Sequence, residues 1–201
     1  MLKFVVALLL LASPAFADVF LYPTKHVKTL IVYGHAAQTK EALEVLEITK
    51  AFYLSKFNLS IDIIDSISIP VDMTGDDTER MAKWQIATKA SRESRGVGLT
   101  LVILSAYPSS VPSIEFANEN VLGRASDIGN LGQIDSLAYV KIVGSAFVAS
   151  RILIHEVGHL AGGFHTSDGG IMAPYAEQNQ ICTDFSATSK HQIETYISSL
   201  P

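Results

Sequence analysis

The sequence predicts an α/β protein with a mixed, twisted sheet of roughly five strands and helices packed against it. Short apolar runs of strand character alternate with longer segments of helical period along residues 27–105. Two more short strands and two helical segments follow a loop rich in Pro and Ser. In a chain of 201 residues, 48% hydrophobic and 17% charged residues are typical of one ordinary globular domain, which excludes disorder and a collagen-like repeat.

Charge and cysteine content narrow the class of protein further. The formal net charge is −5 and the 15 Lys and Arg are scattered, so we expect no nucleic-acid partner. The single cysteine, Cys182, can form no disulfide within the chain, and we expect it to be a small buried side chain.

The N-terminus has the pattern of a secretory signal peptide. Lys3 precedes the apolar run 4–12, and Ala15-Phe16-Ala17 has the small residues that precede a cleavage site. The apolar run is too short to span a membrane, which takes roughly 20 residues, and we expect no span later in the chain. We therefore expect residues 1–17 to be removed and residues 18–201 to form one exported domain, secreted or periplasmic. The segment before the first strand is too short for a folded prodomain; whether a short propeptide or Cys182 confers latency is left open.

The first half of this domain is predicted to alternate strands and helices. Residues 27–33 (VKTLIVY) indicate a strand, and residues 36–56 a helix with Leu43, Leu46, Ala51 and Leu54 near one side. Residues 59–69 alternate apolar and polar side chains, as a half-buried strand does.

A capped helix and a buried strand are expected next. Asp76 and Glu79 have the spacing of a capping box for a helix over residues 78–94. The spacing of an EF-hand is missing, so we predict a cap rather than a calcium site. Residues 98–105 form an uninterrupted apolar run, which predicts a central strand covered on both faces.

The second half supplies two short strands and a long helix. The strands are expected at 121–125 and 137–143, separated by glycines. Residues 146–161 have helical period, with Phe147, Ile154, Val157 and Ala161 on one stripe.

This last helix carries a candidate metal site. His155 and His159, four residues apart, project in the same direction and can bind one ion, while Glu156 points to the edge of the site. Gly162 can adopt the positive φ that ends a helix, and the turn would bring His165 back as a third ligand. Three neutral imidazoles leave one open position on a tetrahedral zinc, which is the arrangement of a catalytic site.

The pattern HEVGHLAGGFH at residues 155–165, followed by Met172 in Gly-Gly-Ile-Met-Ala-Pro, resembles the metzincin zinc endopeptidases. The resemblance implies one catalytic Zn²⁺ on the three histidines, with Met172 as an apolar floor beneath them. It also implies an upper subdomain over about 18–162 and a smaller lower subdomain over about 163–201. Metzincins end in a C-terminal helix, and residues 190–200 resemble that helix.

The expected activity is hydrolysis of peptide bonds in a peptide or protein substrate. Zinc would lower the pKa of its bound water to about 7, and Glu156 would take that proton and pass it to the leaving amine. The family resemblance implies an extended substrate along the strand 121–125 and a pocket lined by residues 173–177. Tyr175 is either a transition-state stabiliser, as a tyrosine is in astacins and serralysins, or part of the pocket lining.

The subfamily is not assigned by these residues. Asp168 and the short distance from His165 to Met172 resemble the matrixins, although Thr166 replaces their usual Ser and Ala-Pro-Tyr follows the Met. The stretch from 121–125 to 136–138 resembles archaemetzincins, whose cysteine-bound second zinc is incompatible with a single Cys.

Two other functional classes stay open. A catalytically silent zinc-binding or interaction protein would keep the histidines but would not need Glu156. A zinc amidase acting on cell-wall peptide would share the same water activation. An inhibitor partner and the oligomeric state are not predicted, and the remaining histidines, His26, His35 and His191, are expected to have surface or capping roles.

Overall fold

The computed structural model describes residues 23–34, 40–70, 75–105, 122–142, 145–173 and 182–201. Its centre is one five-stranded sheet in the order β2-β1-β3-β5-β4. The parallel strands are β1 (Lys25–Gly34), β2 (Leu59–Ser68), β3 (Leu99–Ser105) and β5 (Leu137–Ile142), and β4 (Gly123–Ala125) pairs antiparallel with β5. The prediction of a mixed five-stranded α/β fold is confirmed.

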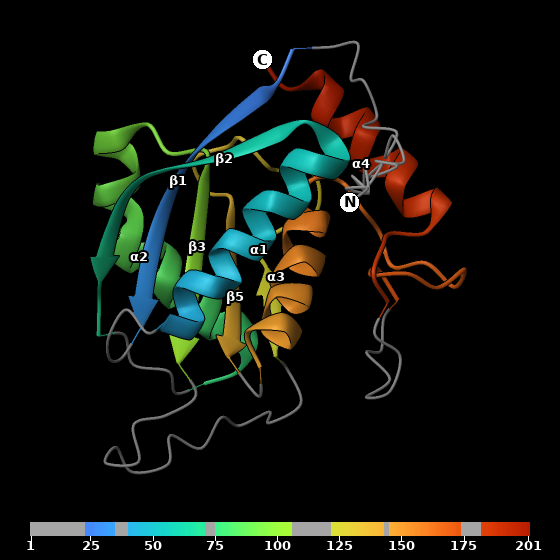
Figure 1. Cartoon of the computed structure of the whole chain (residues 1–201). Coiled ribbons are helices and arrows are strands. Elements are labelled where there is room, and N and C mark those ends of the chain that lie inside the picture. The colour runs from blue at the N-terminus through green and yellow to red at the C-terminus, as the bar shows by residue number, and fades with distance from the viewer. Residues whose placement is uncertain (1–22, 35–39, 71–74, 106–121, 143–144, 174–181) are drawn as a thin grey trace, which may run out of the picture.

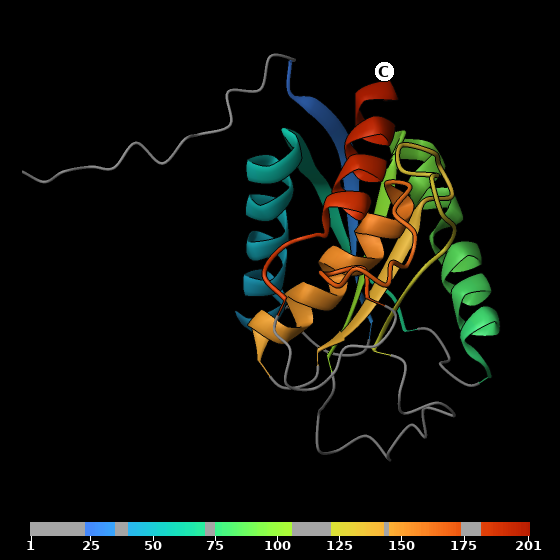
Figure 2. The ribbon, with the colours of Figure 1, turned by 90° about the vertical axis from the view of Figure 1, so that its right-hand side faces the viewer.

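Helices cover both faces of this sheet. They are α1 (Lys40–Phe57), α2 (Asp77–Arg95), α3 (Ala146–Leu160) and α4 (Ala187–Ser199). Helices α1 and α3 lie on one face and α2 on the other, which Figures 1 and 2 show from two sides. Helix α4 packs on the turn after α3, where Tyr196 and Ile193 approach Gly162 and Gly163.

The core follows from side chains that alternate along the strands. In β3, Leu99, Leu101 and Ile103 belong to the core beneath α1 and α3, whereas Val102 and Leu104 belong to the core beneath α2. Strands β1 and β5 alternate in the same way, so the three central strands are buried on both faces, as predicted for residues 98–105.

The buried face of α1 differs from the prediction. Leu43 and Leu54 are about half exposed, at 50% and 48%, and Ala51 is exposed as well. The buried stripe contains Leu46 together with Ala42, Val45, Thr49, Tyr53 and Phe57. Leu43 and Leu54 each follow a buried residue by one position, after Ala42 and Tyr53. One position turns a helix by about 100°, which carries a side chain off the buried face.

Two further patterns are only partly as predicted. Alternation in β2 buries Leu59 and Ile61, but Ile63 and Ile64 are exposed because β2 is an edge strand whose register with β1 shifts at that point. Of the stripe predicted along α3, Ile154, Val157 and Ala161 are buried, whereas Phe147, in the first turn of the helix, is 43% exposed.

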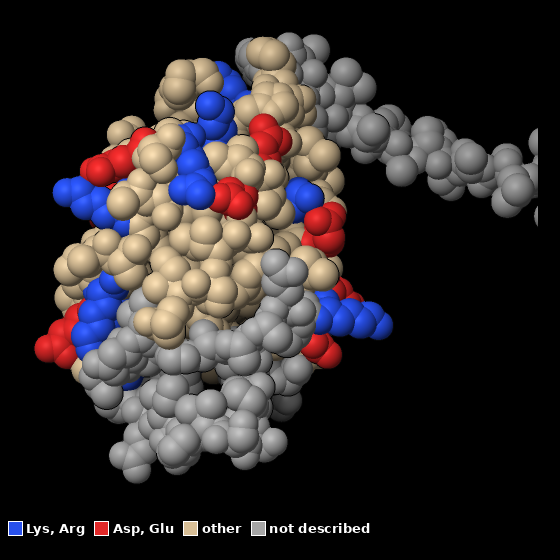
Figure 3. Space-filling view, turned by 90° about the vertical axis from the view of Figure 1, so that its left-hand side faces the viewer, with Lys and Arg blue, Asp and Glu red and all other residues tan. Residues whose placement is uncertain are grey.

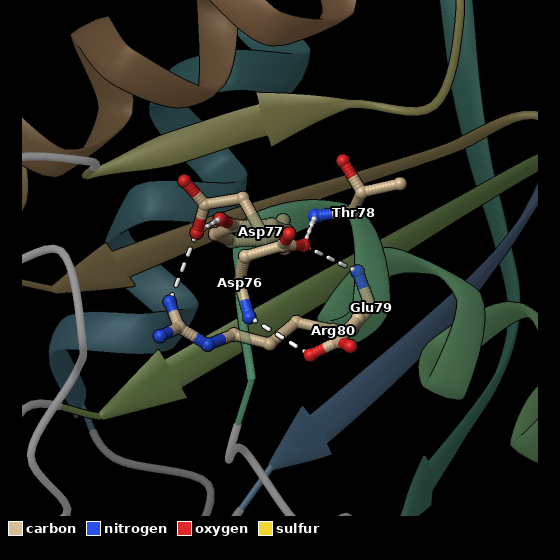
Figure 4. Close-up of polar contacts among 6 residues, drawn as sticks. Asp76, Asp77, Thr78, Glu79 and Arg80 are labelled. Carbon is tan, nitrogen blue, oxygen red and sulfur yellow. Dashed lines mark hydrogen bonds and ion pairs between the residues drawn. The ribbon is translucent and has the colours of Figure 1, made fainter.

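The predicted capping box of α2 is present. Asp76 accepts hydrogen bonds from the backbone N–H groups of Thr78 and Glu79, and the Glu79 side chain accepts from the Asp76 N–H (Figure 4). The backbone bonds to Thr78 and Glu79 lower the pKa of the Asp76 carboxyl. Asp77 instead pairs with the buried Arg80 at 2.9 Å and accepts a hydrogen bond from Tyr139. Both carboxylates therefore have structural partners.

The surface beside β2 and α2 mixes charges of both signs. Lys and Arg side chains lie beside Asp and Glu around the margin of this face (Figure 3). One such contact joins Arg95 to Asp65 at 2.7 Å. Among the described residues, no helix has the length and apolar character needed to cross a bilayer.

Candidate metal centre

Helix α3 presents His155 and His159 on the side that faces the C-terminal segment. The helix begins after the N-cap Ser145, whose side chain accepts the Val148 N–H, and its opposite side is buried against β5 and α1. Tyr53 on α1 donates a hydrogen bond to the Ile154 carbonyl at 2.7 Å, which fixes α3 just before His155. The two histidines lie one turn apart, as their spacing predicts.

The chain reverses direction immediately after α3. Gly162 has a φ of 85°, and the N–H groups of Gly162 and Gly163 donate to the carbonyls of His159 and Gly158. This is the Schellman arrangement, in which a residue with positive φ ends the helix. The left-handed turn predicted at Gly162 is confirmed, and it brings His165 back towards α3.

The three imidazoles converge on one point. His165 Nε2 lies 3.2 Å from His155 Nε2 and 3.1 Å from His159 Nε2. A tetrahedral zinc with Zn–N bonds of about 2.0 Å places two nitrogens about 3.3 Å apart, so these separations fit one such ion. Among the His, Cys, Asp and Glu side chains of the described residues, these three histidines lie close enough together to share one metal ion.

Hydrogen bonds orient two of the rings for metal binding. His155 Nδ1 donates to the Ile171 carbonyl at 2.6 Å, and His159 Nδ1 donates to the Gly163 carbonyl at 2.8 Å. Because a carbonyl only accepts, the proton of each neutral ring is on Nδ1 and the Nε2 lone pair points to the common centre. Burial lowers the pKa of His155 to about 4 and also lowers the pKa of His159, which favours the neutral, ligating form.

Met172 and its neighbours support α3 from below. Met172 is fully buried, and a Cβ on Gly158 would lie only 2.9 Å from its sulfur. The turn that contains Met172 is tied to the segment before α4, because Gly170 bridges Phe185 and the Ile171 N–H donates to the Asp184 carbonyl. This tie also holds the Ile171 carbonyl to which His155 donates.

A side chain at Gly170 is expected to disrupt this tie. Gly170 has a φ of 79°, and a Cβ there would overlap the Ser186 backbone nitrogen and lie 3.0 Å from the Phe185 carbonyl carbon. We expect Gly170→Ala to lower the free energy of unfolding by about 3 kcal/mol, from left-handed strain plus backbone overlap. Urea unfolding measures the loss.

Gly169 provides the matched control for that experiment. It has a similar φ of 85°, but a Cβ there meets open space, so Gly169→Ala is expected to cost only about 1 kcal/mol. Equal losses in the two variants would mean that the close approach at Gly170 contributes nothing.

Glu156 lies beside the edge strand β4. A Cβ on Gly123 would lie 3.1 Å from Glu156 Oε1, and the carboxyl is hydrogen-bonded to the backbone of Ala125. Burial raises the pKa of Glu156 to about 8, against the smaller lowering effects of this bond and of Arg124. In the metal-free protein the group therefore holds a proton at neutral pH, and a nearby dication would favour its release.

The stability of the metal-free protein is expected to fall between pH 6.5 and 8. The folded pKa of Glu156, about 8, is above its unfolded value of 4.5, so its contribution is complete below pH 4.5 and is lost as the pH passes through 8. The lowered pKa of His155 acts in the opposite direction, but only below its unfolded value of 6.5. At about 1.4 kcal/mol per pH unit, the loss from pH 6.5 to 8 is about 2 kcal/mol.

Urea unfolding in the presence of a chelator, at pH 6.5 and pH 8, measures this loss. Glu156→Gln should remove most of the difference, because a carboxamide does not titrate. The same pH dependence in wild type and Glu156→Gln would assign it to another group.

The other residues singled out in the sequence have varied positions. Tyr175 and most of the predicted pocket segment 173–177 lie outside the described residues, as do the signal segment and His35. Cys182 is only partly buried, which corrects the prediction of a buried side chain.

The other two described histidines and Asp168 lie at the surface. His26 pairs with Asp62, and His191 is exposed. Asp168 is exposed, with its pKa lowered to about 2 by the hydroxyls of Thr166, Thr188 and Ser186.

Sequence reasoning missed the groups that orient the rings. The Ile171 and Gly163 carbonyls carry no sequence signal, since every residue has one. Tyr53, which fixes α3, is one of several aromatic residues in α1 and is distinguished only by its tertiary contact.

Fold and site together define an α/β protein in which one helix and the turn after it bring three histidines together. No protein-family model matches the chain, and no curated protein matches its sequence. Several solved structures share its fold.

Two of these solved structures are metalloproteinase-II from Bacteroides fragilis and archaemetzincin from Methanopyrus kandleri. The first matches 86% of this chain with a TM-score of 0.61 and 14% identity, and this chain spans about half, 53%, of its length. The second matches 86% of this chain and 96% of its own, with a TM-score of 0.55 and 14% identity. A chain in a chaperone–substrate complex matches 72% of this chain and 27% of its own, at TM-score 0.53 and 15% identity. At these identities the likeness shows the fold, which is metzincin-like.

Proposed function

We propose that this chain is an exported zinc-dependent endopeptidase of the metzincin type. The observation that carries the proposal is the convergence of three imidazoles, with His165 Nε2 within 3.2 Å of Nε2 on both His155 and His159, beside a buried carboxyl at a sheet edge. The metalloproteinase and archaemetzincin that share the fold support it. Export is proposed from the pattern of residues 1–17, so the mature protein should begin at Asp18.

The residues of the site divide the chemistry between them. His155, His159 and His165 would hold one Zn²⁺, which would supply Lewis-acid chemistry at this centre. Glu156 would hold a proton at its carboxylate, taking it from the attacking water and passing it to the leaving amine. The bond of Glu156 to the backbone of Ala125 supports this role, because it keeps the carboxyl beside the edge strand.

The substrate is proposed to lie extended along β4. Leu122 accepts a hydrogen bond from the Lys141 N–H, and the Ser126 N–H donates to the Leu137 carbonyl. In an antiparallel pair such bonds recur at every second residue, so the backbone groups of Gly123 and Ala125 point away from β5. A peptide that adds a strand at this edge would pass next to Glu156.

Cleavage of denatured casein and of a mixed peptide library by residues 18–201 tests the proposal. We expect internal cleavage that a chelator abolishes and that added zinc restores. Digests analysed by mass spectrometry would identify the preferred bonds.

If the folded, zinc-loaded protein cleaves neither casein nor any library peptide, the endopeptidase proposal is wrong. Release of amide-linked fragments from cell-wall peptide in a parallel assay would then assign the protein as a zinc amidase. Zinc binding without either activity would assign it as a binding protein.

A further inference from the structure

Three hydroxyl groups connect the loop after His165 to the start of α4. The Thr166 hydroxyl lies 3.3 Å from the Ser186 hydroxyl and 3.1 Å from the Ser189 hydroxyl, and the two serine hydroxyls are 3.0 Å apart. Ser189 is fully buried and Thr166 is partly buried. The three oxygens therefore lie within hydrogen-bond distance of one another and are here called the hydroxyl triangle.

Each member of the hydroxyl triangle has a backbone tie as well. Ser186 is the N-cap of α4, and its oxygen accepts the Ser189 N–H at 3.2 Å. The Thr166 N–H donates to the Met172 carbonyl at 3.1 Å. Each hydroxyl has one donor and two acceptor positions, so a member that accepts from a neighbour can still donate its own proton outside the triangle.

Asp168 adds a charged acceptor to the same cluster. The hydroxyls of Thr166, Thr188 and Ser186 hydrogen-bond its carboxylate and hold its pKa at about 2. Asp168 is therefore ionised at any pH at which the protein would work. Its charge also lies at the N-terminus of α4, where the helix dipole favours an anion.

The loop tied down in this way carries two parts of the metal centre. His165 directly precedes Thr166, and the Ile171 carbonyl, which orients His155, lies near the other end of the same loop. His155 and His159 are fixed by a helix and by their Nδ1 bonds. No such bond joins Nδ1 of His165 to a described residue, and this ring is carried by the backbone directly before Thr166.

We propose that Thr166, Ser186, Ser189 and Asp168 are positioning residues of the metal centre, which hold His165 and the Ile171 carbonyl at metal-binding distance through the N-terminus of α4. The inference rests on the metal site of the proposed function but not on peptidase activity. Groups that orient metal ligands from behind typically change metal affinity by about 10–100-fold when removed.

Zinc affinity of Thr166→Val, Thr166→Ser and Ser189→Ala tests this inference. Thr166→Val keeps the shape of the side chain and removes its hydroxyl, so we expect zinc to bind about 10–100-fold more weakly. Thr166→Ser restores the hydroxyl and should bind zinc like the wild type. The control is Thr195→Val, which removes an exposed hydroxyl of α4 that donates to the His191 carbonyl.

Competition with a chromophoric chelator gives the affinities, and the absorption spectrum of the Co²⁺-loaded protein reports the ligand geometry. Melting of each metal-free variant separates a local effect from general destabilisation. Weaker zinc binding in Thr166→Val and in Ser189→Ala, with rescue by Thr166→Ser, would support the inference. If Thr166→Val does not fold, the Ser189→Ala affinity decides alone.

Wild-type zinc affinity in a folded Ser189→Ala or Thr166→Val would overturn the inference, whatever happens to the melting temperature. Failure of the wild type itself to bind zinc would be a different result. It would remove the metal centre of the proposed function, and the inference would fall with it.

Discussion

Replacing Glu156 with Gln is expected to lower kcat/KM for peptide hydrolysis by about 10²–10⁴-fold, the usual contribution of a general acid–base group. The carboxamide has the same shape as the carboxyl, so it can keep the contact with β4, but it cannot take up or deliver a proton. The expected loss corresponds to about 3–5 kcal/mol of transition-state stabilisation. Initial rates on a peptide found in the library digest measure it.

Zinc binding separates this effect from loss of the metal. Glu156 is not among the three converging side chains, so Glu156→Gln should bind zinc with an affinity close to that of the wild type. Glu194→Gln is the control, because Glu194 lies on α4 and its side chain pairs with Lys190 at the surface, at 3.7 Å. Undiminished cleavage by zinc-loaded Glu156→Gln would show that another group moves the proton.

Replacing His159 with Ala is expected to abolish both activity and stabilisation by zinc. In the wild type, free zinc at about 1,000 times its Kd should add about 4 kcal/mol to the free energy of unfolding. His159→Ala leaves only two nitrogens at the centre, and zinc sites normally have at least three protein ligands. Melting curves recorded with zinc and with a chelator should therefore coincide for this variant.

The metal-free stability of His159→Ala should change far less than its response to zinc. The substitution removes the bond to the Gly163 carbonyl, which costs about 1 kcal/mol. His191→Ala, an exposed histidine on α4, is the control and should respond to zinc like the wild type. A His159→Ala protein that zinc still stabilises fully would place the metal elsewhere.

Much of the fold could be predicted because its signals are local. The unbroken apolar run at 98–105 predicted a strand covered on both faces, and β3 has that burial. The Asp76 and Glu79 pair predicted a capping box, which depends on contacts within one helical turn. Where a pattern left several helix faces apolar, as in α1, the sequence could not select the buried one, because packing against β2 and α3 makes that choice.

By itself, the sequence determined the α/β class, the order of the elements and the residue types of the candidate site. His155 and His159 share a side because they are four apart on a helix, and Gly162 can reverse the chain because it has no Cβ. These are consequences of local geometry, which the sequence encodes directly.

Only the tertiary structure decided how the site is held together. The Ile171 carbonyl behind His155, the approach of Gly170 to Ser186, the edge strand beside Glu156 and the hydroxyl triangle on α4 all join segments distant in the chain. Backbone carbonyls and serine hydroxyls are too common to predict a contact from sequence. Their partners are set by the packing of α3, β4 and α4, because only packing determines which of many equivalent polar groups come within hydrogen-bond distance.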